Sequence, residues 1–439
     1  MIRKFLFLSL LFVCGPLLAD EQPPFEVTDP ATTENFRQVY YTVDQLVSAV
    51  SSSSSTYATI AGTQTFTGVN TFTGANVITA ASINGSGLWG FRNRILNGDM
   101  RIDQKNVGAA FTVNVTATVR HLDGNWQGSG AAADGVFTVQ QLSATPPTGF
   151  THYIRCSVTT ADASIGAGQR YYVGQPIEGS NIRDFLLGSA SAKTFTLSFW
   201  VRSSVTGTFS GVFLNGAGNE SYPFTYVINA ADTWEQKSVT VAGDTGGTWV
   251  TTTAAGIYAI FDLGSGSSFR GTAGAWTGSG FIGATGATSL ISTLNATWDL
   301  TGVQLELGSI ATAFEFRPIT IELASCQRYF WKTLPQALPV VDNPGSTNSS
   351  ISYRVTTAGV SNNGVAVRFP VSMRGTPTVT FYNPNATGSN WRNANDTATS
   401  GASAATQTGS DAIYVTNAQV AGDGVGELCV LHATASSEL

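Results

Sequence analysis

Charged side chains are scarce in this sequence, and that scarcity narrows the classes of protein to which it can belong. Lys, Arg, Asp and Glu together make up 11% of the 439 residues, about half the share of an ordinary soluble domain. Acidic residues outnumber basic ones by 28 to 22, the formal net charge is −6, and no basic cluster is present. Nucleic acids are bound through clustered Lys and Arg, so we expect no nucleic-acid partner.

Cysteine and histidine are also scarce, and their positions do not match the common metal-binding and nucleophile patterns. The four cysteines lie far apart: Cys14, Cys156, Cys326 and Cys429. The three histidines are equally scattered: His121, His152 and His432. Zinc sites need closely spaced Cys and His ligands, so we expect no zinc and no other cofactor. Nothing in these spacings requires a disulfide bond.

The usual signatures of catalysis are missing as well. The sequence has no Gly-x-Ser-x-Gly elbow, no phosphate-binding loop and no His-Glu-x-x-His motif. A polysaccharide-cutting enzyme needs two carboxylates about 5–9 Å apart. The candidate pairs, Glu178 with Asp184 and Asp262 with Glu306, belong to no motif. We therefore predict a protein that is not an enzyme.

The first 19 residues contain an apolar run that is too short for a membrane span. Two basic residues precede the run, which extends from Phe5 to Val13, and small residues follow up to Ala19. This order is typical of a secretory signal cleaved after Ala19. An uncleaved apolar anchor is the alternative interpretation of residues 1–19, and the sequence leaves both open.

The residues that replace the missing charge are Gly, Thr, Ser and Ala, a composition that favours short strands joined by small-residue turns. Alternating apolar and polar side chains predict strands over residues 195–202, 237–241, 256–261 and 303–307. Many such strands over residues 91–318 indicate a jelly roll or sandwich. The predicted fold class is all-β.

The C-terminal third is predicted to form a helix followed by a second β module. A short connecting helix is expected over 319–335, ended by Pro335. A C-terminal β-sandwich is expected over 336–439, with clear strands over 365–369 and 378–382. The Asn-, Ser- and Thr-rich stretch 383–409 is predicted to be a long surface loop.

A six-residue repeat occupies residues 56–90. Apolar side chains recur every six residues in a Thr-rich context, each followed two residues later by Gly or Ala: Ile60, Phe66, Phe72 and Ile78. One apolar side chain in six cannot build a core within a single chain, but three copies around a common axis can bury all of them. We predict a homotrimeric stalk; the alternative is a Thr/Gly-rich linker.

A second pattern upstream also favours association between copies. Asp29 and Pro30 form a good helix start, and Phe36, Val43 and Val50 then recur every seven residues. This spacing is that of a coiled-coil seam, which a neighbouring stalk would support because so short a helix is unstable alone. An ordinary amphipathic helix is the alternative. We assign residues 20–55 to an N-terminal attachment segment with a short coiled coil.

Several stretches of the sequence resemble the modules of bacteriophage and prophage tail fibres. They are Asn93 to Gln104, Asp262 to Gly271, Leu300 to Ser309, Ala313 to Pro318, Cys326 to Phe330, Arg368 to Arg374 with Pro377, and His432 to Ala435. The resemblance covers about 340 residues and implies a virion fibre whose jelly-roll and C-terminal β domains touch the host surface or cap the fibre. The apolar leader and the short attachment segment depart from that pattern.

Carbohydrate-binding jelly rolls are similar to the module that this resemblance implies, and some hold a structural calcium near the opening and last strands. Asp99 and Glu306 occupy comparable places here, but two carboxylates do not make a calcium site of six or more ligands. We therefore predict no metal, with these two residues as weak candidates.

Aromatic side chains are the candidate glycan-binding residues, because their faces stack on the C–H surfaces of sugars. Trp200 lies on the polar side of its predicted strand, and the other candidates lie in Gly- and Ser-rich or surface stretches: Tyr171, Tyr172, Trp276 and Trp391. Interface packing in a trimer is the alternative role for each of them.

The sequence taken together predicts a structural phage fibre on the virion. Its partners would be two further copies of itself, other virion proteins through the N-terminal segment, and a host cell-surface glycan. A capsid-bound head fibre without a receptor role and a secreted bacterial sugar-binding adhesin are the alternatives.

Overall fold

A computed structural model describes residues 82–83, 86–87, 91–113, 118–120, 123–131, 134–357, 363–395, 399–418 and 423–439. The predicted leader, the coiled-coil residues Phe36, Val43 and Val50, and the stalk residues Ile60, Phe66, Phe72 and Ile78 lie outside this part of the chain. A small hairpin, β1 (Ser82–Ile83) and β2 (Ser86–Gly87), precedes the main body. No helix among the described residues is both long and apolar enough to cross a membrane.

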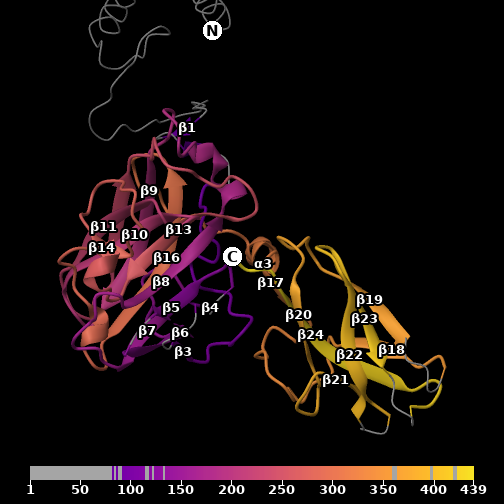
Figure 1. Cartoon of the computed structure of the whole chain (residues 1–439). Helices are drawn as coiled ribbons and strands as arrows, with labels where there is room; N and C mark the ends of the chain where they lie inside the picture. Colours follow the sequence, from indigo (N-terminus) through magenta and orange to yellow (C-terminus); the bar gives the residue numbers. More distant parts are fainter. Residues whose placement is uncertain are drawn as a thin grey trace, which may run out of the picture. The chain divides into compact units, whose positions relative to one another are not determined.

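The region 91–318 contains two six-stranded antiparallel sheets, drawn in indigo to orange in Figure 1. Sheet I has the order β12 (Glu235–Val241), β9 (Phe195–Ser203), β16 (Thr297–Leu307), β7 (Tyr153–Thr160), β6 (Val136–Leu142), β3 (Phe111–Val113). Sheet II has the order β11 (Ser221–Ile228), β10 (Gly207–Asn215), β13 (Ala255–Asp262), β8 (Arg170–Glu178), β5 (Gln127–Ala131), β4 (Thr118–Arg120). Two short turns of 3-10 helix, η1 (Gly179–Asn181) and η2 (Arg183–Phe185), follow β8.

The side-chain alternation in these strands explains the sandwich. In β9 the inward side chains Leu197, Phe199 and Val201 are fully buried, as the period of two predicts. Phe199 meets Phe261 of sheet II with ring centroids 5.0 Å apart, so one continuous apolar core joins the two sheets. The predicted strands of this region are confirmed, with ends extended by a few residues.

The outer faces of the two sheets differ. The outer face of sheet II is covered by residues 263–292, which contain η3 (Ser267–Phe269), the parallel pair β14 (Arg270–Gly271) and β15 (Gly283–Ala284), and η4 (Leu290–Ser292). Ile282 from this segment packs on Val212 and Ile260 of sheet II. The outer face of sheet I keeps exposed side chains, among them Gln236 and Ser238. The exposed outward side chains of sheet I therefore lie mainly toward its β12 edge, whereas Thr301, Gln304 and Glu306 on β16 are buried.

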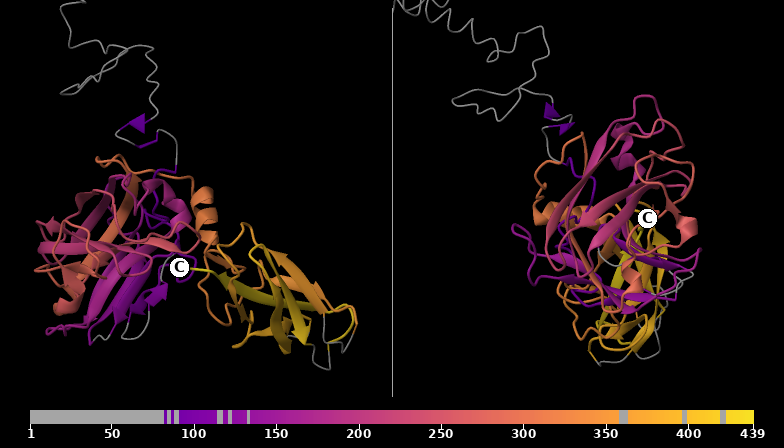
Figure 2. Two further views of the ribbon diagram at one scale, coloured as in Figure 1. Left: turned by 45° about the horizontal axis from the view of Figure 1, so that its top comes forward. Right: turned by 90° about the vertical axis from the view of Figure 1, so that its left-hand side faces the viewer.

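The helix predicted over 319–335 is shorter than expected. Helix α3 spans Ile319–Gln327, the orange helix in the left view of Figure 2, and Phe330–Lys332 forms strand β17. The β17 backbone pairs with β24, from Phe330 opposite Ser436 to Lys332 opposite Thr434. Because this partner strand lies about 100 residues further along the chain, local helical spacing could not reveal the end of the helix.

The C-terminal part is an eight-stranded antiparallel sheet system, shown in orange and yellow in Figure 1. Its central path is β17, β24 (Leu428–Ser436), β21 (Asn390–Asn393), β22 (Thr399–Thr408), β23 (Ala412–Ala418) and β19 (Asn363–Arg368), and β24 also pairs with β18 (Ile351–Arg354) and β20 (Thr378–Tyr382). The predicted strands near 365–369 and 378–382 are confirmed.

The stretch 383–409 is not the surface loop that its composition predicts. It contains all of β21 and β22, and Trp391 of β21 is fully buried in the C-terminal core. The indole packs at right angles to Tyr353, 4.9 Å between ring centroids. Pairing with neighbouring strands overrides the loop preference of Asn, Ser and Ala.

Candidate functional site

The open outer face of sheet I carries a group of aromatic and charged side chains. We call Phe150, Trp200, Arg202, Trp234 and Asp299 the outer-face cluster. Trp200 and Arg202 point outward from β9 because they alternate with its buried residues. On the neighbouring β16, Asp299 lies opposite Arg202, and Thr301 lies opposite Trp200. The cluster thus sits at the middle of the sheet.

A buried carboxylate fixes the charged part of this cluster. Asp299 is 1% exposed and accepts hydrogen bonds from both Arg155 and Arg202. Arg155 donates through Nε and Nη2 at 2.7 and 2.8 Å, a bidentate pair, and Arg202 donates through Nε at 2.7 Å. The hydrogen bond to Asp299 raises the pKa of the Arg155 guanidinium above its ordinary value. Both guanidinium planes are therefore held in place, with remaining N–H groups available on an open face.

Trp234 and Tyr153 enclose the Arg202 guanidinium. Its central carbon lies 4.7 Å from the Trp234 ring centroid and 5.2 Å from that of Tyr153. The two rings meet nearly perpendicularly at 5.4 Å, and Trp234 Nε1 donates to the Thr145 carbonyl at 2.9 Å. These contacts orient a partly exposed indole without taking up all of its surface.

A glycine in β16 brings two aromatic rings down onto the sheet. Gly302 lies at a register shift between Thr301 and Gln304 and has φ +60°. A Cβ at this position would lie 2.6 Å from the Phe150 ring and 3.0 Å from Trp200. The absence of a side chain therefore lets both rings lie against the backbone. Phe150 in turn contacts Phe314 and Phe316, at 5.2 and 5.4 Å, which extends the aromatic surface.

The structure separates the five predicted glycan-binding aromatics. Trp200 lies on the open face of sheet I, partly exposed. Trp276 is partly exposed in the segment that covers sheet II, where its Nε1 donates to the Ala242 carbonyl at 2.8 Å and its ring packs on Tyr222 and Trp249. The remaining three are buried in cores and present no ring face to solvent: Tyr171, Tyr172 and Trp391.

The burial of the tyrosines has a plain structural cause. Tyr171 points into the sandwich core from β8, and its hydroxyl donates to Asp162 at 2.7 Å. Tyr172 points the other way but is covered by the segment over sheet II. Burial raises the pKa of Tyr171 to about 12. Two successive residues in a strand point to opposite faces of the sheet. One of the two tyrosines therefore points into the core of the sandwich.

The carboxylates of the two weak calcium candidates, Asp99 and Glu306, accept hydrogen bonds from other groups of the protein. Asp99 accepts a hydrogen bond from Arg101 Nε. Glu306 is fully buried and accepts from Gln304 Nε2, the Thr312 backbone N–H and the Thr312 hydroxyl at 2.6–2.8 Å. In the described part of the chain, no group of three or more His, Cys, Asp and Glu side chains could hold a metal ion.

The candidate catalytic carboxylates bond to other groups of the protein. Asp262 ends β13 of sheet II, where it accepts from Ser210 and Arg270, whereas Glu306 lies on the outer face of sheet I. Glu178 accepts from Arg328 and Tyr329, and Asp184 accepts from Arg94 at 2.6 Å. Asp262 and Glu306, on opposite sides of the sandwich, cannot act as a pair on one substrate.

Sequence reasoning missed most of the outer-face cluster. The alternation of β9 places Arg202 beside Trp200 and could have identified that pair. Trp234, Phe150 and Asp299 come from three other segments, and only the strand order β12-β9-β16 brings them together.

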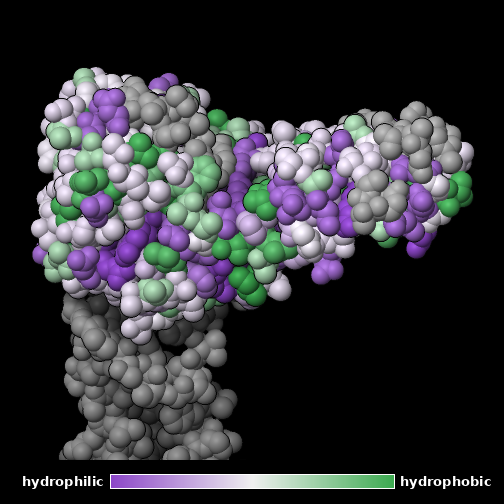
Figure 3. All heavy atoms as spheres, turned by 90° about the horizontal axis from the view of Figure 1, so that it is seen from below, coloured by the Kyte–Doolittle hydropathy of each residue, from purple (hydrophilic) through white to green (hydrophobic). Residues whose placement is uncertain are grey.

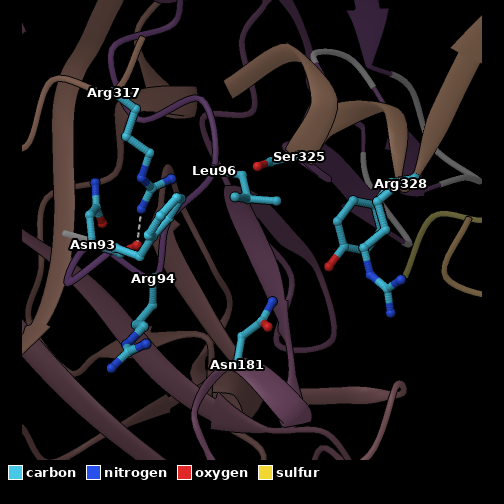
Figure 4. A pocket seen from close by; sticks show the side chains of 9 residues that line it. Asn93, Arg94, Leu96, Asn181, Arg317, Ser325 and Arg328 are labelled. Atoms are coloured by element: carbon cyan, nitrogen blue, oxygen red, sulfur yellow. Dashed lines mark hydrogen bonds between the residues drawn. The ribbon is translucent and has the colours of Figure 1, made fainter. Parts of the chain in front are cut away.

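A small hollow lies where residue 91 joins the sandwich, beside helix α3. It measures about 220 Å³ and is lined by Phe91, Asn93, Arg94, Leu96, Asn181, Arg317, Ser325, Arg328 and Tyr329. Figure 4 shows Arg317 and Arg328 on opposite sides, with Leu96 and Ser325 between them. Each of the three arginines already pairs with a carboxylate, on Asp184, Glu322 or Glu178, so the hollow carries no free anion-binding charge.

The surface away from these features is mixed in character. On the face seen in Figure 3, hydrophilic and hydrophobic residues are interspersed in small groups. Such a surface is ordinary for a protein whose polar exterior consists largely of hydroxyl and amide groups.

No protein-family model matches this chain, and no curated protein matches its sequence. Among solved structures, it is similar to the enzymatically active domain of tailspike protein 4 from bacteriophage CBA120, at 16% identity over 49% of this chain and 21% of that chain, with a TM-score of 0.26. A Bacteroides thetaiotaomicron protein described as sugar binding shows 13% identity over 49% of this chain and 99% of its own, with a TM-score of 0.30. The family 11 carbohydrate-binding module from Clostridium thermocellum shows 10% identity over 47% and 98% of the two chains, with a TM-score of 0.22. Similarities at this level do not assign the chain to a family, so its function has to be argued from its own side chains.

Proposed function

We propose that the β-sandwich of residues 91–318 binds a carbohydrate chain across the outer face of sheet I. The observation that carries this proposal is the outer-face cluster: partly exposed indoles of Trp200 and Trp234 beside a fixed Arg155–Asp299–Arg202 network. Sugars present apolar C–H faces and a rim of hydroxyl groups. Aromatic faces take the former, and planar guanidinium and amide groups hydrogen-bond to the latter.

The geometry favours an extended ligand over a small one. The cluster lies on an open sheet face rather than in a closed cavity, and Trp200 has the exposed Gln236 of β12 opposite it. Enclosed pockets suit compact ligands, whereas an open face with several shallow contacts suits a polymer. A single site of this kind binds weakly, and repeated copies would raise the overall affinity.

We further propose that the whole chain is a homotrimeric fibre protein of a phage virion, attached through its N-terminal segment and displaying its β domains to host-surface glycan. The six-residue and seven-residue apolar repeats of residues 36–78 support this role, because both patterns need neighbouring copies to be buried. A capsid head fibre and a secreted adhesin remain the alternatives.

A binding role rather than catalysis is part of the same proposal. Three of the four carboxylates named as candidate catalysts are buried and hydrogen-bonded within the protein: Glu178, Asp262 and Glu306. A general acid or base must reach the substrate proton, and these three carboxylates are buried and already bonded within the protein.

The test is a glycan array probed with the purified full chain, followed by calorimetric titration of the best ligand. We expect Trp200→Ala to weaken that binding roughly tenfold or more, as removal of a central aromatic contact does, with an unchanged melting temperature. Trp276→Ala is the matched control, because this indole is also partly exposed but packs at the edge of the sandwich core, on Tyr222 and Trp249. Loss of binding in the Trp276 variant alone, or equal binding by all three proteins, would contradict the outer-face site.

A further inference from the structure

At three positions of helix α3 the usual burial of apolar side chains and exposure of charged ones is reversed, although Cys326 on the same helix is buried as expected. The helix buries Glu322, which is 4% exposed, and leaves Ile319 and Ile321 exposed by 46% and 41%. A helix on a soluble protein normally turns its apolar side chains inward. The reversal indicates that another surface covers these isoleucines.

The buried acid has a clear structural reason. Glu322 accepts a hydrogen bond from the Asn97 backbone N–H and another from Arg317 Nη1 at 3.1 Å. Arg317 also donates to the Asn93 carbonyl. The acid therefore holds α3 against the first turns of the sandwich, and in this orientation residues 319 and 321 point outward.

Two further apolar side chains near the start of α3 are also exposed. Phe91 is 59% exposed and Phe316 is 55% exposed. Glu315, next to Phe316, accepts the Phe91 backbone N–H at 2.6 Å, and the Arg317 guanidinium lies 5.7 Å from the Phe91 ring centroid. We call Phe91, Phe316, Ile319 and Ile321 the entry patch. Clustered exposure of this kind marks an interaction surface, unlike single exposed residues.

The position of the patch in the chain identifies what covers it. Phe91 directly follows the 35 residues that carry the predicted stalk. In a parallel trimer with the three chains in register, three copies of residue 91 leave the stalk at the same height around one axis. The surface beside residue 91 on each copy then faces its neighbours.

The hollow shown in Figure 4 is continuous with this surface. Phe91 and Ser325 line it, and Ser325 lies one turn of α3 after Ile321, to whose carbonyl its hydroxyl donates at 2.9 Å. At about 220 Å³ it is smaller than the roughly 300–1,000 Å³ pockets that hold drug-sized ligands. Its size suits a single side chain inserted from a neighbouring copy, with Phe91 and Leu96 as the apolar part of a largely polar lining.

We propose that the entry patch is the surface through which copies of this chain contact one another in the region that follows the predicted stalk in the sequence. The inference rests on the trimeric fibre in the proposed function and deepens it, because it assigns the β-domain contact to named residues. Because Phe316 of the patch contacts Phe150 of the outer-face cluster, the variants that test the contact between copies leave both phenylalanines unchanged.

The test is cysteine cross-linking of the full chain. Ile321→Cys is treated with a flexible bis-maleimide, and the products are separated under denaturing conditions, with the unsubstituted protein as the background for native cysteines. Cys156, Cys326 and Cys429 are buried. Val227→Cys on β11 is the matched control, since Val227 is 46% exposed and lies away from the patch. We expect linked dimers and trimers with Ile321→Cys and none above background with Val227→Cys.

A second measurement follows the mass of the native protein by sedimentation. We expect Ile319→Glu with Ile321→Glu to raise the concentration at which the trimer half-dissociates roughly tenfold or more, because carboxylates would be buried between copies. Glu is a good helix former, so α3 is kept. Val227→Glu with Leu294→Glu should leave that concentration unchanged.

The outcomes separate the inference from the function on which it rests. A trimeric parent whose Ile321→Cys form reacts with a monofunctional maleimide but does not cross-link would overturn the entry-patch contact and leave the trimer intact. A monomeric parent would overturn both. Either result leaves the glycan titration of Trp200→Ala to be judged by itself.

Discussion

The buried carboxylates of this protein differ in whether an arginine side chain donates hydrogen bonds to them. Asp299, Asp262 and Glu178 are buried and hydrogen-bonded to arginine, as buried charges normally are. Asp123 differs, because it is fully buried, its Oδ2 accepts only a long hydrogen bond of 3.3 Å from the Gln104 backbone N–H, and its Oδ1 has no partner in the described structure. Burial raises the pKa of Asp123 to about 7.

Because the pKa of Asp123 is raised, we predict that replacing Asp123 with the neutral Asn stabilises the protein at high pH but not at low pH. A carboxyl whose pKa is higher in the folded than in the unfolded state contributes stability below the unfolded value, and this contribution is lost as the pH rises through about 7. We expect Asp123→Asn to raise the melting temperature by a few degrees at pH 8 and to change it little at pH 4, as measured by calorimetry. The same change at both pH values would show that the charge of Asp123 is not the cause.

At the scale of the element, strand β16 combines a buried carboxylate with a register shift. It supplies Asp299 to the outer-face cluster, and three residues later its register shifts at Gly302. The shift lets Leu300 and Val303, three positions apart, both point into the core. It also creates the flat backbone on which Phe150 and Trp200 lie.

A substitution at Gly302 tests the role of this shift. Gly302→Ala should lower the free energy of unfolding by about 2–4 kcal/mol, because it adds backbone strain at positive φ of about 1–2 kcal/mol and overpacking against the Phe150 ring. Gly286→Ala is the matched control: Gly286 has φ +81°, and a Cβ added there would meet nothing within 4 Å. Denaturant unfolding of the two variants measures the difference. Equal losses would mean that Phe150 and Trp200 do not press on β16.

At the scale of the whole molecule, one buried carboxylate connects β8 of the sandwich with the segment that leads to the C-terminal strands. Glu178 is 1% exposed and accepts hydrogen bonds from Arg328 Nε and Nη2 at 3.0 and 2.8 Å and from the Tyr329 hydroxyl at 2.8 Å. Burial by itself raises the pKa of Glu178, but these hydrogen bonds and one from Ser180 outweigh it and lower the pKa below its ordinary value.

The hydrogen bonds of Glu178 predict that Glu178→Gln is less stable than the parent protein at neutral pH. In acid the two proteins should be about equally stable. Glu178→Gln should lower the free energy of unfolding by about 2 kcal/mol at neutral pH, less than for a fully buried pair because the Arg328 side chain is about one-third exposed. Since the folded pKa is lowered, the contribution is present above the unfolded pKa and is lost as the pH falls through the folded value. Unfolding experiments at pH 7 and pH 3 check this. A difference between variant and parent that persists at pH 3 would contradict the ionic origin.

The sequence by itself predicted the all-β class and six of the strands, because a period of two is written locally in the chain. The alternation in 195–202 identified β9 and the outward direction of Trp200. The end of α3 and the strands within 383–409 could not be predicted in this way, because each depends on pairing with residues far away in the sequence. Trp391 is the clearest example: its loop-like neighbours concealed a core residue.

The outer-face cluster and the entry patch were decided by tertiary structure alone. Phe150, Trp234 and Asp299 become neighbours of Trp200 only through the strand order of sheet I, and Ile319 and Ile321 are exposed only because Glu322 is held by Asn97 and Arg317. Periodicity reports which side of an element is apolar, whereas the partner that covers each side is set by long-range packing. What the sequence determined is therefore the elements and their faces, and what the tertiary structure decided is which of those faces stayed open.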